Sequence, residues 1–378
     1  MRETTPRTRT RPHPLGIAFV SFSLMVLVWI MLFAMPARAV EYRIDKVADG
    51  FVVPWSLAFL PDDGFLVTER DGALWQVATD GTRQQIKGLP DITAIGQGGL
   101  LDVVAAEDFI TSRRIFLSYT TDVPGGAGTA MATAILPEGS DRIERVFRIF
   151  QLQRGNQNGR HFGGRIVETA DGHLFLTIGD MGEAREAQNV GSHWGKIIRL
   201  RIDGTVPRDN PFQMRRNALP EIWSLGHRNP QGLARTREGA LVSSEHGAKG
   251  GDELNWIESG ANYGWPVISY GTHYSGRKIG EGTEKRGMRQ PLIYWDPSIA
   301  PSGMMVYEGT MFPEWRGDLF VGSLKFDHIA QVAGKGLAQV RQIKTDETQR
   351  VRDVREAPDG SIWFLSEGNG AVYRLWRP

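Results

Sequence analysis

The sequence predicts an all-β protein, a six-bladed β-propeller. From residue 40 onward it consists of short apolar runs separated by Asp-Gly, Pro-Asp and Gly-rich turns, which is typical of strands joined by tight connections. No long segment has the period of a helix. The 45 glycines and 11 tryptophans suit a fold with many turns and with aromatic packing between its sheets.

A weak repeat indicates the number of blades. A short apolar strand, in most copies preceded by an acidic residue and a glycine, occurs at residues 64–68, 115–118, 174–177, 240–243, 319–322 and 362–365. Propeller blades are four-stranded units of roughly 40–50 residues, so six copies predict six blades. The alternative is that the copies occur by chance, because a Gly-containing turn followed by apolar residues is common in β-hairpins. The spread of the copies over the whole domain favours the propeller.

The first 39 residues have the pattern of a secretory signal. Four arginines precede an apolar run at residues 15–35, and Ala37, Arg38 and Ala39 then provide a small-residue cleavage site. The 21-residue run is also long enough to span a bilayer. We therefore expect cleavage near Ala39 or, as the alternative, a retained membrane anchor. In both cases we expect residues 40–378 to form one propeller domain in the periplasm, with membrane contact only through an uncleaved N-terminal segment.

Composition excludes several classes of site and partner. The chain contains no cysteine, so it uses no disulfide, thiolate metal site or cysteine nucleophile. Its formal net charge is +1, but the first 39 residues hold five arginines and one glutamate, which leaves about −3 for the remainder. Without a basic face, the chain is not expected to bind nucleic acid. The motifs of nicotinamide Rossmann enzymes, P-loop proteins and α/β-hydrolases are also missing.

Two loop segments offer candidates for chemistry. His161 lies in the Gly-rich polar segment 158–165, just before a predicted strand, and histidine is the usual proton acceptor near neutral pH. Taken alone, a loop histidine is more often a surface or hydrogen-bonding residue. Arg228, in the turn-rich segment 225–232, could stabilise a developing oxyanion or bind a carboxylate. The alternative for Arg228 is a turn arginine that caps backbone carbonyls.

Two further groups could bind a cation and an anion. Residues 244–253 and 262–266 combine hard oxygen ligands with glycines, which favours Ca²⁺ over a transition metal, although a solvated acidic loop is the alternative. They belong to the polar stretch 245–287, which we expect to be a long functional loop. Lys325 follows a predicted strand, and Arg350 and Arg352 open another, on which residues two apart share a face. These three cations could bind a polycarboxylate, or they could be ordinary edge-strand charges.

A set of motifs in a fixed order resembles a known family. The motifs are GQGGLL (96–101), HFGGR (161–165), TIGD (177–180), GHRNPQG (226–232), GAKGGDE (247–253), NYGWP (262–266), APSG (300–303), GSLK (322–325) and RVRD (350–353). Each motif is weak alone, but the ordered set over residues 45–375 resembles the soluble pyrroloquinoline quinone (PQQ) glucose/aldose sugar dehydrogenase family, and is closer to its aldose sugar dehydrogenase branch. That family is a six-bladed propeller, in agreement with the repeat.

The resemblance implies a catalytic centre of His161, Arg228 and Asp180. His161 would be the general base that takes the proton of the anomeric hydroxyl of an aldose, while hydride leaves C1 for C5 of the quinone. Arg228 would stabilise the negative charge that arrives on the quinone. Asp180 would orient His161. The product would be a lactone, and the electrons would pass to an external acceptor, either a quinone or a redox protein.

The resemblance also implies PQQ and Ca²⁺ as cofactors. The positions that match PQQ contacts are Gln97, Asn229, Lys325, Arg350 and Arg352. The lysine and the two arginines would offset the three carboxylates of PQQ. The backbone carbonyls of Gly247 and Ala248 match the ligands of a calcium ion that touches PQQ. Glu253 and Tyr263 match a second, structural calcium site.

Four positions depart from the family pattern. Arg160 stands where the glucose enzyme has an acid beside the histidine, which affects the basicity of His161 and the contacts to the sugar. Ala248 replaces a proline, although only its carbonyl is needed. His273 lies where one branch has an acidic calcium ligand, and Leu292 changes the expected substrate wall. The resemblance therefore does not carry the sugar preference to this chain.

Two other classes of function remain as alternatives to the dehydrogenase. A calcium-dependent propeller hydrolase, such as a lactonase, would centre its metal on side-chain carboxylates and amides near the axis, and the acids here do not occupy matching blade positions. A non-catalytic binding propeller would not need a histidine base beside a set of cations. The sequence therefore favours the aldose dehydrogenase.

Overall fold

The structure, a computed structural model, describes residues 40–61 and 64–378. The predicted signal at residues 1–39 therefore lies outside the described residues. Arg43–Pro378 forms one compact unit, which contains all of the described strands. Within the described part of the chain, no helix is both long enough and apolar enough to cross a membrane.

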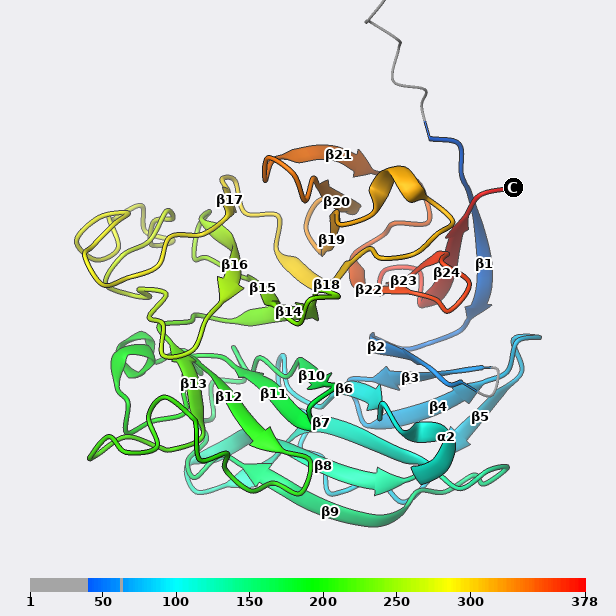
Figure 1. The fold of residues 1–378 in the computed structure, drawn as a ribbon, viewed down its shortest axis with the longest axis horizontal. Coiled ribbons are helices and arrows are strands. Elements are labelled where there is room, and N and C mark those ends of the chain that lie inside the picture. The colour runs from blue at the N-terminus through cyan, green and yellow to red at the C-terminus, as the bar shows by residue number, and fades with distance from the viewer. Residues whose placement is uncertain (1–39, 62–63) are drawn as a thin grey trace, which may run out of the picture. The chain divides into compact units, whose positions relative to one another are not determined.

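The unit Arg43–Pro378 is made of six antiparallel sheets of four strands each, which confirms the predicted six-bladed propeller (Figure 1). Blade 1 contains β2 (Pro54–Phe59), β3 (Phe65–Glu69), β4 (Ala73–Val77) and β5 (Arg83–Ile86). Blade 2 contains β6 (Leu100–Ala105), β7 (Arg114–Val123), β8 (Gly126–Ile135) and β9 (Glu144–Gln151). Blade 3 contains β10 (Ile166–Thr169), β11 (His173–Ile178), β12 (Lys196–Arg201) and β13 (Ile222–Leu225).

The second half of the unit repeats this arrangement. Blade 4 contains β14 (Pro230–Arg235), β15 (Leu241–Glu245), β16 (Asp252–Ile257) and β17 (Ile293–Trp295). Blade 5 contains β18 (Pro301–Val306), β19 (Leu319–Ser323), β20 (His328–Val332) and β21 (Gln339–Ile343). Blade 6 contains β22 (Val351–Glu356), β23 (Ile362–Ser366), β24 (Ala371–Trp376) and β1 (Arg43–Asp49). The helical segments are short: α2 (Phe109–Ser112) and the 3₁₀ turns η1 (Ala184–Gln188) and η2 (Pro313–Trp315).

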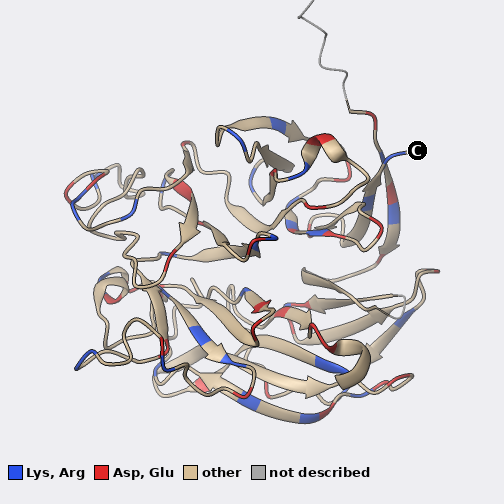
Figure 2. Ribbon diagram, in the orientation of Figure 1, with Lys and Arg blue, Asp and Glu red and all other residues tan. Residues whose placement is uncertain are grey.

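The first strand of each blade is its inner strand. Each inner strand contacts the inner strand of the next blade, and β22 contacts β2, so the six strands surround a central axis (Figure 1). The ring is closed by the two ends of the unit, because β1 pairs antiparallel with β24, with Arg43 opposite Trp376 and Asp49 opposite Ala371. Basic and acidic residues are interspersed over the blades (Figure 2).

The six copies of the sequence repeat are the second strands of the blades, β3, β7, β11, β15, β19 and β23. These strands are almost entirely buried, since each packs between its sheet neighbours and the adjacent blades. Burial on both faces explains why the sequence there is continuously apolar instead of alternating. The prediction of a loop over residues 245–287 was wrong at its start, because Asp252–Ile257 forms β16; the long connection runs over residues 258–292.

Buried ion pairs lie between the inner strands. Arg165, whose side chain is 1% exposed, lies 3.2 Å from Asp102 and 3.1 Å from Asp353, which are both fully buried. Arg355 contacts the same two carboxylates at 3.0 and 3.2 Å, and the Arg165 guanidinium stacks on the ring of Trp55. These side chains come from the inner strands of blades 1, 2 and 6 and from the residue before β10, so they tie four blades together.

Candidate active site

The predicted site residues meet at one end of the blades, in two kinds of loop. Antiparallel pairing places the start of each inner strand beside the end of the second strand, as with Pro230 opposite Glu245 and Val351 opposite Ser366. The loops that lead into inner strands hold Gln97, His161, Arg228, Asn229 and Arg350. The turns that follow second strands hold Asp180, Gly247, Ala248 and Lys325. Residues far apart in the sequence therefore converge because each blade repeats one geometry.

A polar cavity of about 700 Å³ opens at this end. Seven of the predicted residues line it: Gln97, Asn229, Gly247, Ala248, Lys325, Arg350 and Arg352. Its wall also includes the cations Arg70 and Lys249 and one carboxylate, that of Asp296. A cavity of this size and positive charge suits a small polyanionic ligand.

The three predicted catalytic residues, His161, Asp180 and Arg228, do not line this cavity themselves. His161 and Asp180 form a hydrogen-bonded pair next to it, since the His161 N–H bonds to the lining residue Gln97. The Nδ1 atom of His161 lies 2.6 Å from Oδ1 of Asp180. Asp180 also accepts hydrogen bonds from the backbone N–H of Gly182 at 2.8 Å and from the indole N–H of Trp265 at 2.8 Å. The carboxylate therefore fixes Nδ1 of His161 as the protonated nitrogen and leaves Nε2 as a proton acceptor.

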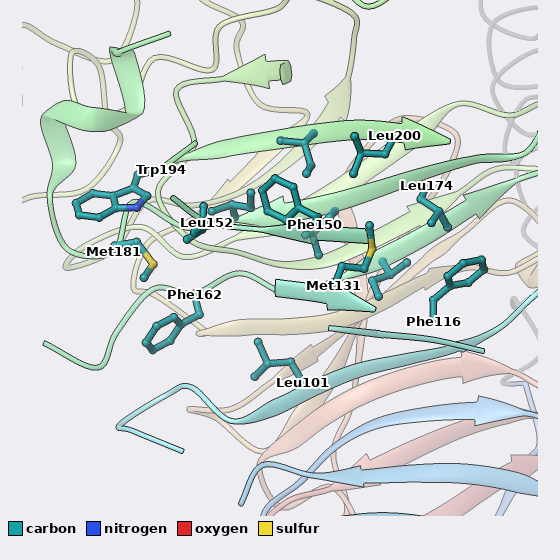
Figure 3. Packing of buried hydrophobic residues seen from close by; sticks show 14 of the residues in the cluster. Leu101, Phe116, Met131, Phe150, Leu152, Phe162, Leu174, Met181, Trp194 and Leu200 are labelled. Atoms are coloured by element: carbon teal, nitrogen blue, oxygen red, sulfur yellow. The ribbon is translucent and has the colours of Figure 1, made fainter. Parts of the chain in front are cut away.

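The loop that carries His161 is fixed on both sides of the histidine. Its backbone has a φ of 60°, and its N–H donates to Oε1 of Gln97 at 2.8 Å. The adjacent residues are anchored in the hydrophobic core between blades 2 and 3, since Phe162 follows His161 and Met181 follows Asp180, and both are at most 1% exposed (Figure 3). The pair is thus held by packing as well as by hydrogen bonds.

The surroundings keep His161 neutral. Burial lowers the pKa of His161, and the positive charges of Arg228 and Arg160 act in the same direction, against the hydrogen bond that His161 donates to Asp180. Burial alone would raise the pKa of Asp180, but its contacts with His161 and the charge of Arg228 hold it below the usual range. At neutral pH the pair is therefore a neutral imidazole, with its proton on Nδ1, beside an ionised carboxylate. A general base requires this state.

Arg228 is held next to this pair with one buried N–H unsatisfied. Its backbone N–H donates to Glu245 at 2.9 Å, its guanidinium donates to the carbonyl of His246 at 3.3 Å, and it stacks over the ring of Trp265. The Nε atom of Arg228 is buried and has no hydrogen-bond partner among the described residues. A buried donor without an acceptor is costly, and an oxygen of a bound ligand would satisfy it.

Arg350 and Arg352 converge on a carboxylate that the sequence analysis did not identify. Glu367, directly after β23, accepts from Arg350 at 3.1 and 3.2 Å and from Arg352 at 2.6 and 2.8 Å. Burial alone would raise the pKa of Glu367, but the two arginines hold it below the usual range. The two side chains point the same way, as predicted, since both bind Glu367 and both line the cavity. The reason differs from strand alternation, because Arg350 precedes β22 with a φ of 47° and only Arg352 lies within the strand.

The predicted calcium ligands Gly247 and Ala248 lie in the turn after β15, on the cavity wall. The N–H of Gly247 donates to Asp252 at 2.8 Å, which fixes the turn. Asp296 and Ser298 bring further oxygen atoms to the same wall. Gly250 is required here, since its φ is 79° and a Cβ atom would lie 2.3 Å from Oδ1 of Asp296. The donor set consists of hard oxygens, which fits Ca²⁺.

Glu253 and Tyr263 do not line the cavity but lie behind it. Burial and the charge of Glu245 raise the pKa of Glu253 to about 8, and Asn255 donates to both carboxylates, at 3.1 and 2.9 Å. The Tyr263 hydroxyl already donates to the carbonyl of Trp256 and accepts from a backbone N–H. Its ring stacks on His227, which places this group under the Arg228 loop. Within the described residues, no three His, Asp or Glu side chains come together as a metal site.

Three residues that shape the site received no role from the sequence: His246 and Trp265, which lie in the segments 244–253 and 262–266, and Glu367, which lies in none of the motifs. His246 lines the cavity, and its Nε2 lies 2.7 Å from the carbonyl of Pro301. Burial first, and then the charge of Arg228, lower the pKa of His246 to about 3, so its ring is neutral. A search of every turn after a second strand would have identified His246 and Glu367. The signal for Trp265 is the NYGWP motif, in the long connection after β16, although the motif alone does not show its contact with Asp180.

Several known proteins are similar to this chain in sequence. The family model described as glucose/sorbosone dehydrogenase matches residues 51–374. The aldose sugar dehydrogenase YliI of Escherichia coli is 42% identical over 94% of this chain and 98% of its own length. The quinoprotein glucose dehydrogenase B of Acinetobacter calcoaceticus is 29% identical, over 76% of this chain and 66% of its own length.

Solved structures give the same result. The apo form of the soluble aldose sugar dehydrogenase from E. coli superposes with a TM-score of 0.86 at 40% identity, and covers 89% of this chain and 99% of that one. The PQQ-bound aldose sugar dehydrogenase from Streptomyces coelicolor has a TM-score of 0.74 at 26% identity, over 89% of this chain and 98% of that one. The six-bladed fold, the family match and the similarity over nearly the whole propeller together show that this chain belongs to the glucose/sorbosone dehydrogenase family.

Proposed function

We propose that this chain is a PQQ- and Ca²⁺-dependent aldose dehydrogenase, which oxidises the anomeric hydroxyl of aldose sugars to lactones and passes the electrons to an external quinone or redox protein. The observation that carries the proposal is the His161–Asp180 pair beside a cavity lined with cations. The PQQ-bound relative from S. coelicolor supports the choice of cofactor. The signal pattern of residues 1–39 supports export to the periplasm.

The residues around the cavity fit PQQ. The carboxylates of PQQ would bind to Lys325, Arg350 and Arg352, and its ring oxygens would accept from the unsatisfied Nε of Arg228. Gln97 and Asn229 offer amide groups on the same wall. The carbonyls of Gly247 and Ala248 would bind a Ca²⁺ ion next to the cofactor. A second ion at Glu253 and Tyr263 is not part of the proposal, because the Tyr263 hydroxyl is already paired and no three His, Asp or Glu side chains of the described residues meet there.

In the proposed reaction, the chain's own residues manage the proton and the developing charge. Bound PQQ would supply the acceptor for a hydride from the sugar. His161 takes the proton of the anomeric hydroxyl on Nε2, because Asp180 holds the proton already on Nδ1. Asp180 then stabilises the imidazolium that results. Arg228, next to this pair, would offset the negative charge that arrives on the acceptor.

The test is a reconstitution of the purified chain. After treatment with a chelator, PQQ and Ca²⁺ are added separately and together, and dye reduction is followed with a panel of aldoses. Activity that requires both additions supports the proposal. Absence of activity, together with no PQQ binding in an absorbance titration, would overturn it and favour the lactonase or the non-catalytic binding propeller.

A further inference from the structure

Lys325, Arg350 and Arg352, the three cations predicted to bind the carboxylates of PQQ, are here called the clamp. The charges of its two arginines are partly neutralised. Glu367 bonds to both Arg350 and Arg352, so one of their two positive charges is offset by its carboxylate. With Lys325, the clamp then supplies two net positive charges. A ligand with three carboxylates needs a further cation or several strong donors elsewhere on the cavity wall.

Arg70 is a further cation on that wall. It directly follows β3 in blade 1, in the turn that corresponds to the turn of Lys325 after β19 and to that of Glu367 after β23. Blade 1 adjoins blade 6 in the ring, so Arg70 continues the row of charges from blades 5 and 6. A calcium ion at Gly247 would belong to blade 4, which is opposite blade 1, and would not compete for a carboxylate that faces Arg70.

The backbone of Arg70 is fixed, while its guanidinium has no partner. Its N–H donates to the carbonyl of Val53 at 3.1 Å, and its carbonyl accepts from Leu100 at 2.9 Å. Gly99, with a φ of 151°, permits this approach, since a Cβ atom there would lie 1.8 Å from the Arg70 oxygen. The side chain is partly buried and has no hydrogen bond or ion pair within the described residues. An anion in the cavity would compensate this cation.

We propose that Arg70 is a cofactor-binding residue, whose guanidinium binds a carboxylate of PQQ. The inference rests on the proposed function and assigns to blade 1 a role in cofactor recognition. Arg70 differs from Lys249, another cation on this wall without a hydrogen bond or ion pair in the described residues, because the Lys249 side chain is exposed and screened by solvent.

The experiment measures the Kd of PQQ by absorbance titration in the presence of Ca²⁺, for the full chain and four variants. Arg70→Met removes the charge but keeps the aliphatic stem that packs on Gly99, so the fold is retained, which thermal unfolding checks. Arg70→Lys keeps the charge without the planar fork. Lys249→Met removes the exposed cation of the same cavity. Arg237→Met removes an exposed arginine in the β14–β15 turn, at the opposite end of its blade.

We expect Arg70→Met to weaken PQQ binding roughly ten- to hundredfold, and to reduce the dependence of Kd on ionic strength. Arg70→Lys should restore part of the affinity, whereas Lys249→Met should have a smaller effect and Arg237→Met none. An unchanged Kd in Arg70→Met would overturn the inference. Equal losses of PQQ affinity in Arg70→Met and Lys249→Met would also overturn it, because they would indicate only the general positive potential of the cavity. If the unaltered chain does not bind PQQ at all, the proposed function fails instead.

Discussion

The imidazole Nδ1 of His161 lies 2.6 Å from Oδ1 of Asp180, although the two residues come from separate loops of blade 3. Every partner of the Asp180 carboxylate is a donor, because Gly182 and Trp265 also direct N–H groups at it. The pair therefore has one stable arrangement, in which Nε2 of His161 is the nitrogen without a proton.

Asp180→Asn should disrupt this arrangement. An amide has one acceptor oxygen for three donors, so its own N–H must face either His161 or Trp265. We expect kcat in the reconstituted enzyme to fall roughly 10²- to 10⁴-fold, with little change in the Kd of PQQ. The matched control is Asp171→Asn, which alters a second His–Asp pair, with His173, away from the cavity. Equal kcat values for the two variants would contradict the role of Asp180.

The pH profile should report the neutral state of His161. Because burial lowers its pKa, the acid limb of kcat/KM should have its midpoint below the ordinary histidine value of about 6.5. Arg160→Gln removes a nearby cation that disfavours the protonated ring, so the pKa of His161 should rise and the midpoint should move to higher pH. Arg237→Gln, far from the site, should leave the midpoint in place. A shift to lower pH in Arg160→Gln would contradict this account.

Breaking the buried ion pairs between the inner strands should lower the free energy of unfolding much more than breaking an exposed pair. Arg165→Leu leaves Asp102 and Asp353 with only Arg355 as a cationic partner, and we expect the free energy of unfolding to fall by about 3–5 kcal/mol. Arg374→Leu breaks the exposed pair with Asp359 and should cost less than about 1 kcal/mol. Urea unfolding of both variants measures the difference. Similar losses of unfolding free energy in the two variants would show that burial does not strengthen the contribution of this network to stability.

Lys196 should also stabilise the fold. Its buried ammonium group donates to the carbonyls of Glu186, Ala187 and Trp194 at 2.9, 3.0 and 2.8 Å. Lys196→Met leaves these carbonyls without that donor and should lower the free energy of unfolding by at least about 2 kcal/mol. The exposed Lys335→Met is the control, and it should change the same quantity by less than about 0.5 kcal/mol.

The six blades could be predicted from the sequence because their second strands are buried on both faces. That burial imposes an uninterrupted apolar run after a turn, as in β19 and β23, and the pattern repeats six times. The pairing of β1 with β24 has no local signal, since the two strands are separated by almost the whole chain. The strand β16 was read as loop because its residues are polar, although Asp252 and Asn255 are buried there and hydrogen-bonded.

The site was predictable where the ordered motifs match the family, because each candidate residue alone had a common structural alternative. The motifs identified His161 and Arg228. In the structure His161 bonds to Asp180, Trp265 donates to the same carboxylate, and Arg228 stacks over Trp265. Glu367 could not be identified in this way, because an isolated glutamate after a strand is usually solvated. Only the three-dimensional structure shows that it binds both clamp arginines.

The pairing of β1 with β24 has a consequence for the order of events during synthesis. Blade 6 lacks its fourth strand until the C-terminal residues have been made, although that strand is among the first to leave the ribosome. The nascent chain must therefore keep an unpaired β-strand available while five blades are completed. The blade that this pairing completes also carries Arg350, Arg352 and Glu367, at the end where β22 and β23 pair.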